Sequence, residues 1–213
     1  MIAELRQGIP LEEFDYGLLM SALSYLKNPR QKITALIRQG HIVRVKKGLY
    51  VWGMAWRKRP VQLELLANLI YGPSIVSGDW ALAYYGMIPE RVPVVTSTGP
   101  KPPKVFHTPL CTFRYERVPI AYHSIGMERN EVSGTGYLIA SAERALADRL
   151  MEIPGLYRPN RKDLEMQLLD ELRIEDESLS KLRPEIMSEL AHASQSPRLH
   201  QLHAYLCERR GYK

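Results

Sequence analysis

Lys and Arg side chains are the residues of this sequence best suited to binding a partner, and the partner they suit is a polyanion. Ten of the chain's 29 Lys and Arg residues fall between Lys27 and Arg59, and no Asp or Glu interrupts them. Residues 1–60 carry eleven bases and four acids, a net charge of +7, whereas the other 153 residues carry 18 and 19 and sum to −1. Binding to a polyanion comes largely from displacing cations condensed on its phosphates, and neighbouring carboxylates would neutralise that effect. This stretch is therefore the expected DNA-contacting surface; the alternative is a solvated basic face that only aids solubility.

Two helices separated by a short break are expected to carry this charge. From Asp15 to Leu26, apolar residues recur at helical spacing, which places one stripe against a core. The pattern then breaks, and Asn28 suits an N-cap while Pro29 suits the first position of a new helix. This second helix is predicted to run from about Arg30 to Gln39 and to stop at Gly40.

The second helix has two different faces. Ile33, Leu36 and Ile37 fall together on a helix that turns about 100° per residue, so they predict the buried side. The opposite side carries side chains that can contact DNA: Arg30, Gln31, Lys32, Thr34, Ala35, Arg38 and Gln39.

A two-stranded hairpin is predicted after this helix. From Ile42 to Trp52 the apolar residues recur every second position around a turn that contains Gly48, so each strand can bury one side. Lys46 and Lys47 are expected to project at the tip. A basic hairpin after two such helices is typical of a winged helix-turn-helix.

This arrangement divides the DNA contacts into two kinds. Gln31, Thr34, Ala35 and Arg38 would lie near base edges in the major groove, where sequence is read. The hairpin would hold phosphates or enter the neighbouring minor groove through three cations: Arg44, Lys46 and Lys47. A winged fold used only for protein contact is the competing interpretation.

A linker is predicted at the end of the basic region. The run Arg57, Lys58 and Arg59 stops at Pro60, where the charge balance also changes. The run could be a third DNA contact or a solvated hinge, and the sequence leaves both open. The predicted boundaries are a winged helix-turn-helix domain at residues 1–58, a mixed α/β domain at residues 59–155 and a helical extension at residues 156–213.

The second and third regions complete an α+β fold. Helices are predicted at residues 61–71 and 79–85 and from Ser141, and strands at 74–76, 92–98, 104–107, 110–118, 120–124 and 137–139. In the helix from Ser141 the small and apolar residues should pack closely, while Glu143, Arg144 and Asp148 should be less buried. Further helices at residues 163–172, 184–193 and 197–209 are expected to cover the sheet or join a second subunit.

Several other functions lack their sequence signatures. No run of eighteen apolar residues and no signal-peptide pattern occurs, so a cytoplasmic protein is expected. His192, His200 and His203 lack a completing Cys or carboxylate at metal-site spacing, so no metal or cofactor is predicted. Asp79 has no carboxylate two residues away, as a nucleotidyltransferase would need, and no Gly-x-Ser-x-Gly turn is present. We therefore predict no catalytic residues.

Three segments of the sequence, Gly40 to Tyr50, Ser77 to Gly86 and Ile139 to Asp148, together resemble the AbiEi-type antitoxins, the regulatory half of an abortive-infection toxin–antitoxin pair. The phrase from Gly40 to Tyr50 is similar to the end of that family's N-terminal winged module. The phrase from Ser77 to Gly86 is similar to a Ser/Gly turn that opens a helix ending in an aromatic–Gly pair, and the phrase from Ile139 to Asp148 to a strand-to-helix segment. Together they cover roughly residues 14–151 in family order, although Ala142 stands where the family often has proline and nothing after Asp163 matches.

The resemblance implies a transcriptional repressor of its own promoter that takes part in phage defence. Its winged module would bind operator repeats in double-stranded DNA, as a homodimer or as cooperating monomers. Its second domain would support repression and counter a nucleotidyltransferase-like toxin without forming a stable complex with it. The alternatives are a winged-helix adaptor that docks protein and a transcriptional regulator unconnected to a toxin.

Overall fold

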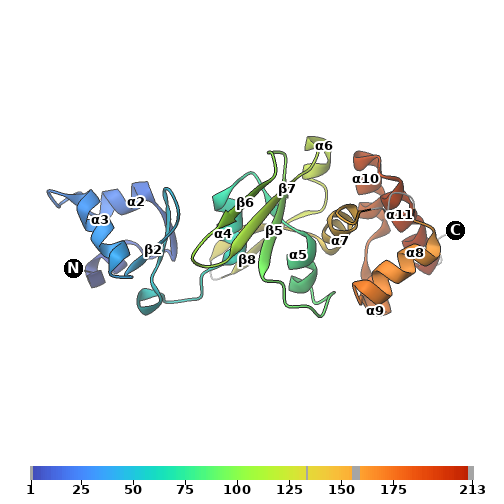
Figure 1. Ribbon diagram of the computed structural model, residues 1–213, viewed down its shortest axis with the longest axis horizontal. Coiled ribbons are helices and arrows are strands. Elements are labelled where there is room, and N and C mark those ends of the chain that lie inside the picture. The colour runs from blue at the N-terminus through green and yellow to red at the C-terminus, as the bar shows by residue number, and fades with distance from the viewer. Residues whose placement is uncertain (1, 133, 155–158, 211–213) are drawn as a thin grey trace.

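The computed structural model describes residues 2–132, 134–154 and 159–210, and it is a mixed α+β protein with a helical C-terminal region. Figure 1 shows three parts in a row: an N-terminal module, a central sheet with helices on its two faces, and a group of C-terminal helices. We call residues 2–59 the N-terminal module and residues 159–210 the C-terminal helices. No helix in the described ranges combines the length and apolar character needed to span a membrane.

The N-terminal module packs three helices against a small antiparallel sheet. Its elements follow in the order α1 (Ile2–Gly8), β1 (Glu13–Asp15), α2 (Tyr16–Ala22), α3 (Pro29–Arg38), β2 (Ile42–Lys46) and β3 (Leu49–Trp52). The strand order is β1-β3-β2, so the hairpin predicted from the sequence is confirmed and a third strand joins it. The sequence pattern missed α1 and β1, and α2 ends at Ala22 rather than at Leu26.

Strand β3 is buried on both of its faces. Tyr50 and Trp52 join the core formed by α1, α2 and α3, where the Trp52 indole donates to the Leu11 carbonyl over 3.0 Å. Leu49 and Val51 point the other way and belong to the core of the central sheet. The hairpin is therefore held between the N-terminal helices and the rest of the molecule.

The central part is a six-stranded mixed sheet. Its elements are α4 (Leu63–Ile70), β4 (Ile75–Val76), α5 (Gly78–Tyr84), β5 (Val94–Gly99), β6 (Lys104–His107), β7 (Thr112–Arg117), α6 (Ile120–His123), β8 (Met127–Val132), β9 (Thr135–Ala140) and α7 (Ala142–Met151). The strand order is β6-β7-β5-β4-β9-β8, with β5 parallel to β7 and β4 parallel to β9. Helix α4 packs on the sheet near the N-terminal module, and α5 and α7 pack together on the side toward the C-terminal helices (Figure 1).

One prediction for this part is wrong, and one strand was missed. Residues 120–123 form helix α6 rather than a strand, because Pro119 acts as the N-cap and Tyr122 turns into the core, where it is fully buried. Strand β8 was not predicted because its residues, Met127–Val132, are mostly polar and lack an apolar alternation. They are largely exposed, as is common in an edge strand.

The C-terminal helices pack mainly on α7 and α6, and Arg183 among them also pairs with Glu128 on β8. They comprise α8 (Arg161–Glu165), a π-helical segment η2 (Met166–Glu171), α9 (Asp176–Lys181), α10 (Pro184–Ser194) and α11 (Pro197–Arg210). The antiparallel pair α10 and α11 matches the two predicted helices within one residue at each end, whereas α9 was not predicted.

Candidate nucleic-acid interface

Helix α3 presents the predicted contact side chains to solvent. Ile33 and Leu36 are buried in the N-terminal core, and Gln31, Thr34 and Arg38 on the other side are exposed. The helix begins with Pro29 at its first turn. It is followed by Gly40, whose φ of +72° is a left-handed conformation that few residues other than glycine adopt at low cost.

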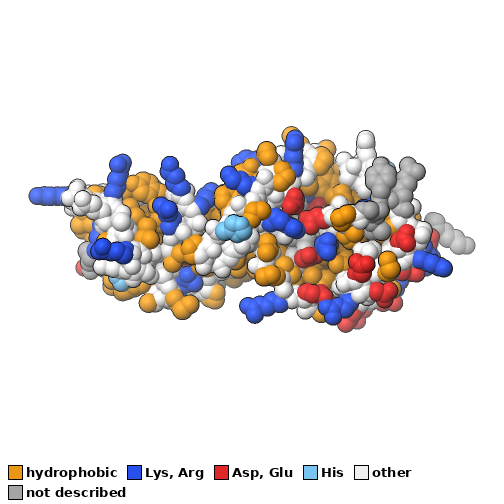
Figure 2. All heavy atoms as spheres, in the orientation of Figure 1, with side chains coloured by type: hydrophobic (Ala, Val, Ile, Leu, Met, Phe, Trp, Pro, Cys, Tyr) orange, Lys and Arg blue, Asp and Glu red, His pale blue; other side chains and the backbone are white. Residues whose placement is uncertain are grey.

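The remaining predicted contacts differ in exposure. Exposed with the first three are Arg30, Gln39, Arg44, Lys47 and Lys58, whereas Lys32, Ala35, Lys46, Arg57 and Arg59 are half-buried. Within the described ranges, no ion pair involves Lys27, Arg30, Lys32, Arg38, Arg44 or Lys47. Figure 2 shows Lys and Arg side chains projecting from the N-terminal module, while Asp and Glu gather toward the opposite end of the molecule.

Three carboxylates of the N-terminal module are bound to partners nearby in the fold. Glu12 and Glu13 are 2% and 5% exposed. Glu12 pairs with Arg6 at 2.5 Å, and Glu13 pairs with Arg59 at 2.8 Å. Asp15 caps α2 by accepting from the Leu18 amide at 2.7 Å. These three acids therefore bind partners within the module and leave the cations of α3 and β2 without neutralising neighbours.

A groove runs between α3 and β2. It has a volume of about 560 Å³, and its lining includes Thr34, Arg38 and Arg44 together with the half-buried Ile37. Pro109, from the β6–β7 turn, also lines it. Two guanidinium groups beside an apolar side chain suit a sugar–phosphate backbone, since the cations attract phosphate and the apolar side chain can contact deoxyribose.

The prediction that both lysines project from the hairpin tip is wrong for Lys46. Its ammonium group donates to the carbonyl of Ile70 at the end of α4, over 2.5 Å, because the face of β2 that carries it packs toward the central sheet. Burial, together with the nearby charges of Lys101 and Lys104, lowers the pKa of Lys46 below its usual 10.5. Lys47 is exposed, as predicted.

The run from Arg57 to Arg59 is neither a free basic surface nor a solvated hinge along its whole length. Arg57 donates to the Trp52 carbonyl over 2.8 Å. Arg59 donates to Glu13 and, over 3.3 Å, to the hydroxyl of Thr135 on β9, so it ties the N-terminal module to the central sheet. Only Lys58 of the three is exposed.

A second group of polar residues lies at the centre of the molecule, where the sequence predicted a less buried helix face. Arg144 and Asp148 are 0% and 3% exposed, and Glu143 is 2% exposed. The Asp148 carboxylate accepts from Arg144 at 2.9 Å, from Ser77 at 2.6 Å and from Tyr122 at 2.9 Å. The guanidinium of Arg144 donates to three backbone carbonyls, those of Tyr122, His123 and Ile125.

This polar cluster is saturated with internal hydrogen bonds. Thr98 completes it, donating to Asp148 over 3.2 Å and accepting from Arg144 over 3.1 Å. Burial and the neighbouring Asp148 carboxylate raise the pKa of Tyr122 well above 10.0, so its hydroxyl stays protonated as a donor. The cluster joins the N-cap of α5, β5, α6 and α7, and its geometry is that of a structural centre. Nearby Asp79 pairs with Arg149 at 2.7 Å and not with a second carboxylate.

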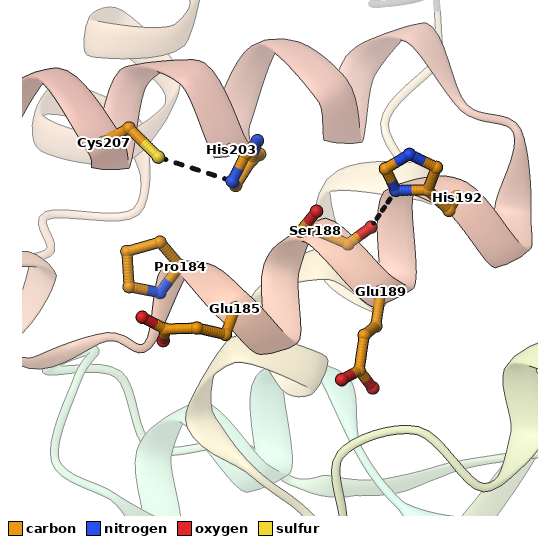
Figure 3. A pocket seen from close by; sticks show the side chains of 7 residues that line it. All are labelled: Pro184, Glu185, Ser188, Glu189, His192, His203 and Cys207. Carbon is orange, nitrogen blue, oxygen red and sulfur yellow. Dashed lines mark hydrogen bonds between the residues drawn. The ribbon is translucent and has the colours of Figure 1, made fainter. Parts of the chain in front are cut away.

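Two of the three histidines considered from the sequence, His192 and His203, line a groove between α10 and α11 (Figure 3). The Sγ of Cys207 lies 3.3 Å from Nε2 of His203, whereas His192 bonds the Ser188 carbonyl over 2.7 Å on the other helix. In the portions of the chain that the structure covers, no three His, Cys, Asp or Glu side chains are placed to hold a metal ion.

No protein-family model matches this chain, and no curated protein matches it.

Proposed function

We propose that this protein is a sequence-specific DNA-binding transcriptional repressor that acts in the cytoplasm through an N-terminal winged helix-turn-helix. One observation carries the proposal: the solvent face of α3 and the adjoining groove carry Arg30, Arg38 and Arg44 without a carboxylate partner among the described residues. A protein that displaces counterions from phosphate needs such unneutralised cations.

The arrangement supports a division of labour on the duplex. Helix α3 would enter the major groove, where Gln31, Thr34 and Arg38 reach base edges. Arg44, in the lining of the groove, and Lys47, at the hairpin turn, would hold phosphates. The two kinds of contact have different effects, since phosphate contacts contribute affinity and base contacts contribute sequence specificity.

The central part of the protein extends the basic surface beyond the hairpin. Lys101 donates to the Gly72 carbonyl, and the Lys104 ammonium lies 5.7 Å from the ring centre of Tyr71. Both lysines are close enough to Lys46 for their charges to lower the pKa of Lys46. Three ammonium groups therefore surround the carbonyl end of α4. Because Arg59 and Lys46 fix the two parts together, the exposed Lys101 and Lys104 would add phosphate contacts to those of the hairpin.

We further propose, from the resemblance to the AbiEi-type antitoxins, that the repressor controls its own promoter and opposes a nucleotidyltransferase-like toxin without a stable complex. The phrase from Ile139 to Asp148 that carries part of the resemblance forms the end of β9 and the start of α7, where the buried Arg144–Asp148 pair lies. The neighbouring reading frame tests this role: a nucleotidyltransferase beside it whose toxicity this protein relieves would support it, and no such neighbour would remove it.

Gel-shift titration with the protein's own upstream DNA tests the DNA-binding proposal. We expect the intact chain to bind that DNA more tightly than a random duplex of equal length, and Arg38→Ala to lose the preference. Arg91→Ala, at an exposed site in the loop before β5, is the matched control and should bind as the intact chain does. Two outcomes would instead favour a protein-docking adaptor. One is equal affinity for both duplexes, and the other is the absence of any binding that an excess of bulk DNA competes away.

A further inference from the structure

Strand β8 leaves one long edge of the central sheet unpaired. It forms the end of the strand order β6-β7-β5-β4-β9-β8, and no described strand bonds to its outer side. Its side chains are largely exposed, including the apolar Met127 and Val132 at 42% and 41%. An open edge of this kind offers backbone donors and acceptors to another strand.

The contacts of β9 show which backbone groups of β8 point outward. Leu138 turns its amide and carbonyl away from β8, toward Asn68, over 2.7 and 3.2 Å. Arg129 lies opposite Leu138, so the backbone amide and carbonyl of Arg129 point away from β9, outward from the open edge of the sheet. Because the direction alternates along a strand, Glu131 shares this orientation with Arg129.

The charges on these two outward residues are opposite and symmetrically placed about Asn130. Arg129 is 67% exposed and Glu131 52% exposed, and within one chain the two form a surface ion pair at 3.5 Å. If a second copy adds its own β8 antiparallel with Asn130 opposite Asn130, Arg129 of each copy stands opposite Glu131 of the other. Directly opposed residues of opposite charge favour pairing, whereas like charges oppose it.

We propose that two copies of this chain associate through their β8 edges in that register. The pairing adds backbone hydrogen bonds between Arg129 and Glu131 in both directions, and two cross-strand ion pairs complete the contact. The exposed Tyr84, which accepts a hydrogen bond from Asn130, lies beside the two-fold axis and gives it an aromatic flank. Many edge strands use charge to block pairing, but here the signs are complementary under two-fold symmetry. The contact is separate from the proposed DNA surface.

Charge reversal tests the register by sedimentation equilibrium at low ionic strength without DNA. We expect the intact chain to move toward twice the mass of one chain as its concentration rises, and Arg129→Glu and Glu131→Arg each to remain at one chain. An equimolar mixture of these two variants should associate again, because every pair between them then joins opposite charges. A mixture that stays at one chain, or single variants that associate like the intact chain, overturns the proposal.

Disulfide trapping tests the two-fold position directly. In a Cys111→Ser, Cys207→Ser background, Asn130→Cys should form a cross-linked dimer, since opposed residues of this non-hydrogen-bonded type lie about 4.5 Å apart between Cα atoms. Val132→Cys is the matched control on the same face; its two copies would lie four residues apart along the strands, roughly 13 Å. Cross-linking at Asn130 with at least a tenfold lower yield at Val132 supports the register. Equal yields, or none at Asn130, overturn it, and neither result bears on DNA binding.

Discussion

Arg38 and Lys47 are both exposed cations, but they stand at different places on the proposed DNA surface. We expect Arg38→Ala to cost about 1–3 kcal/mol on the operator and little on random DNA, because it removes a base contact. Lys47→Ala should weaken binding to every duplex and reduce the salt dependence by about one phosphate. Fluorescence anisotropy over a salt series measures both effects. Equal losses on operator and random DNA for the two variants would refute the division of labour.

Lys46 and Lys47 are neighbours in sequence, but they have different surroundings and different expected roles. Its ammonium is bound to the Ile70 carbonyl, so it belongs to the contact between the hairpin and α4. For that reason Lys47, and not Lys46, is the appropriate probe of phosphate binding at the hairpin tip.

The buried pair of Arg144 and Asp148 predicts a large effect on stability. Asp148→Ala would leave the guanidinium of Arg144 buried without its carboxylate, and breaking a buried pair in this way costs about 3–5 kcal/mol. Urea unfolding followed by circular dichroism measures the change. The double variant Arg144→Met, Asp148→Leu removes both charges and should recover part of the loss. A loss below about 1 kcal/mol for Asp148→Ala would contradict the proposed structural role.

At the scale of elements, the contact between α7 and the start of α10 should respond to acid. Burial raises the pKa of Glu143, but hydrogen bonds from Arg183 outweigh this effect and lower it below 4.5. A carboxyl whose folded pKa is depressed stabilises the fold above its unfolded pKa, and that contribution is lost as the pH falls through the folded value.

Arg183→Gln tests this linkage. We expect the variant to melt at a lower temperature than the intact chain near pH 7, and the difference to shrink below about pH 4.5 as Glu143 becomes protonated. Lys162→Gln, at an exposed site on α8, is the control and should leave the melting temperature nearly unchanged at both pH values. A difference that persists unchanged in acid would show that Glu143 is not the group responsible.

At the scale of the whole molecule, Arg59 connects the N-terminal module to the central sheet. Arg59→Ala removes the pairing with Glu13 and the bond to Thr135, and it leaves the buried Glu13 carboxylate with the amide of Gln62 as its remaining donor. We expect faster cleavage by thermolysin in the linker from Arg57 to Gln62, with an unchanged salt slope of DNA binding because no phosphate contact is lost.

Lys58→Ala is the matched control for this variant. Lys58 is exposed in the same linker, and its side chain forms no ion pair in the ranges that the structure describes. It should leave the cleavage rate near that of the intact chain. A lower salt slope for Arg59→Ala would show that this residue contacts phosphate after all.

Local pattern alone determined the main features of the N-terminal module. The apolar spacing of Ile33 and Leu36, Pro29 before them and Gly40 after them define α3 and its exposed side, and the alternation from Ile42 to Trp52 defines the hairpin. These features depend on residues within a turn or a strand of one another, so the sequence contains the information needed to predict them.

Tertiary structure decided where the polar faces point. Periodicity identified the polar sides of α7, the hairpin and the linker, but it could not show whether solvent or another polar group lies opposite. Asp148 meets Ser77 across 71 positions of sequence, Arg59 meets Thr135 across 76, and Lys46 meets Ile70 across 24. A charged side chain can be buried only where such distant partners satisfy it, and those partners are brought together by the packing of the whole chain.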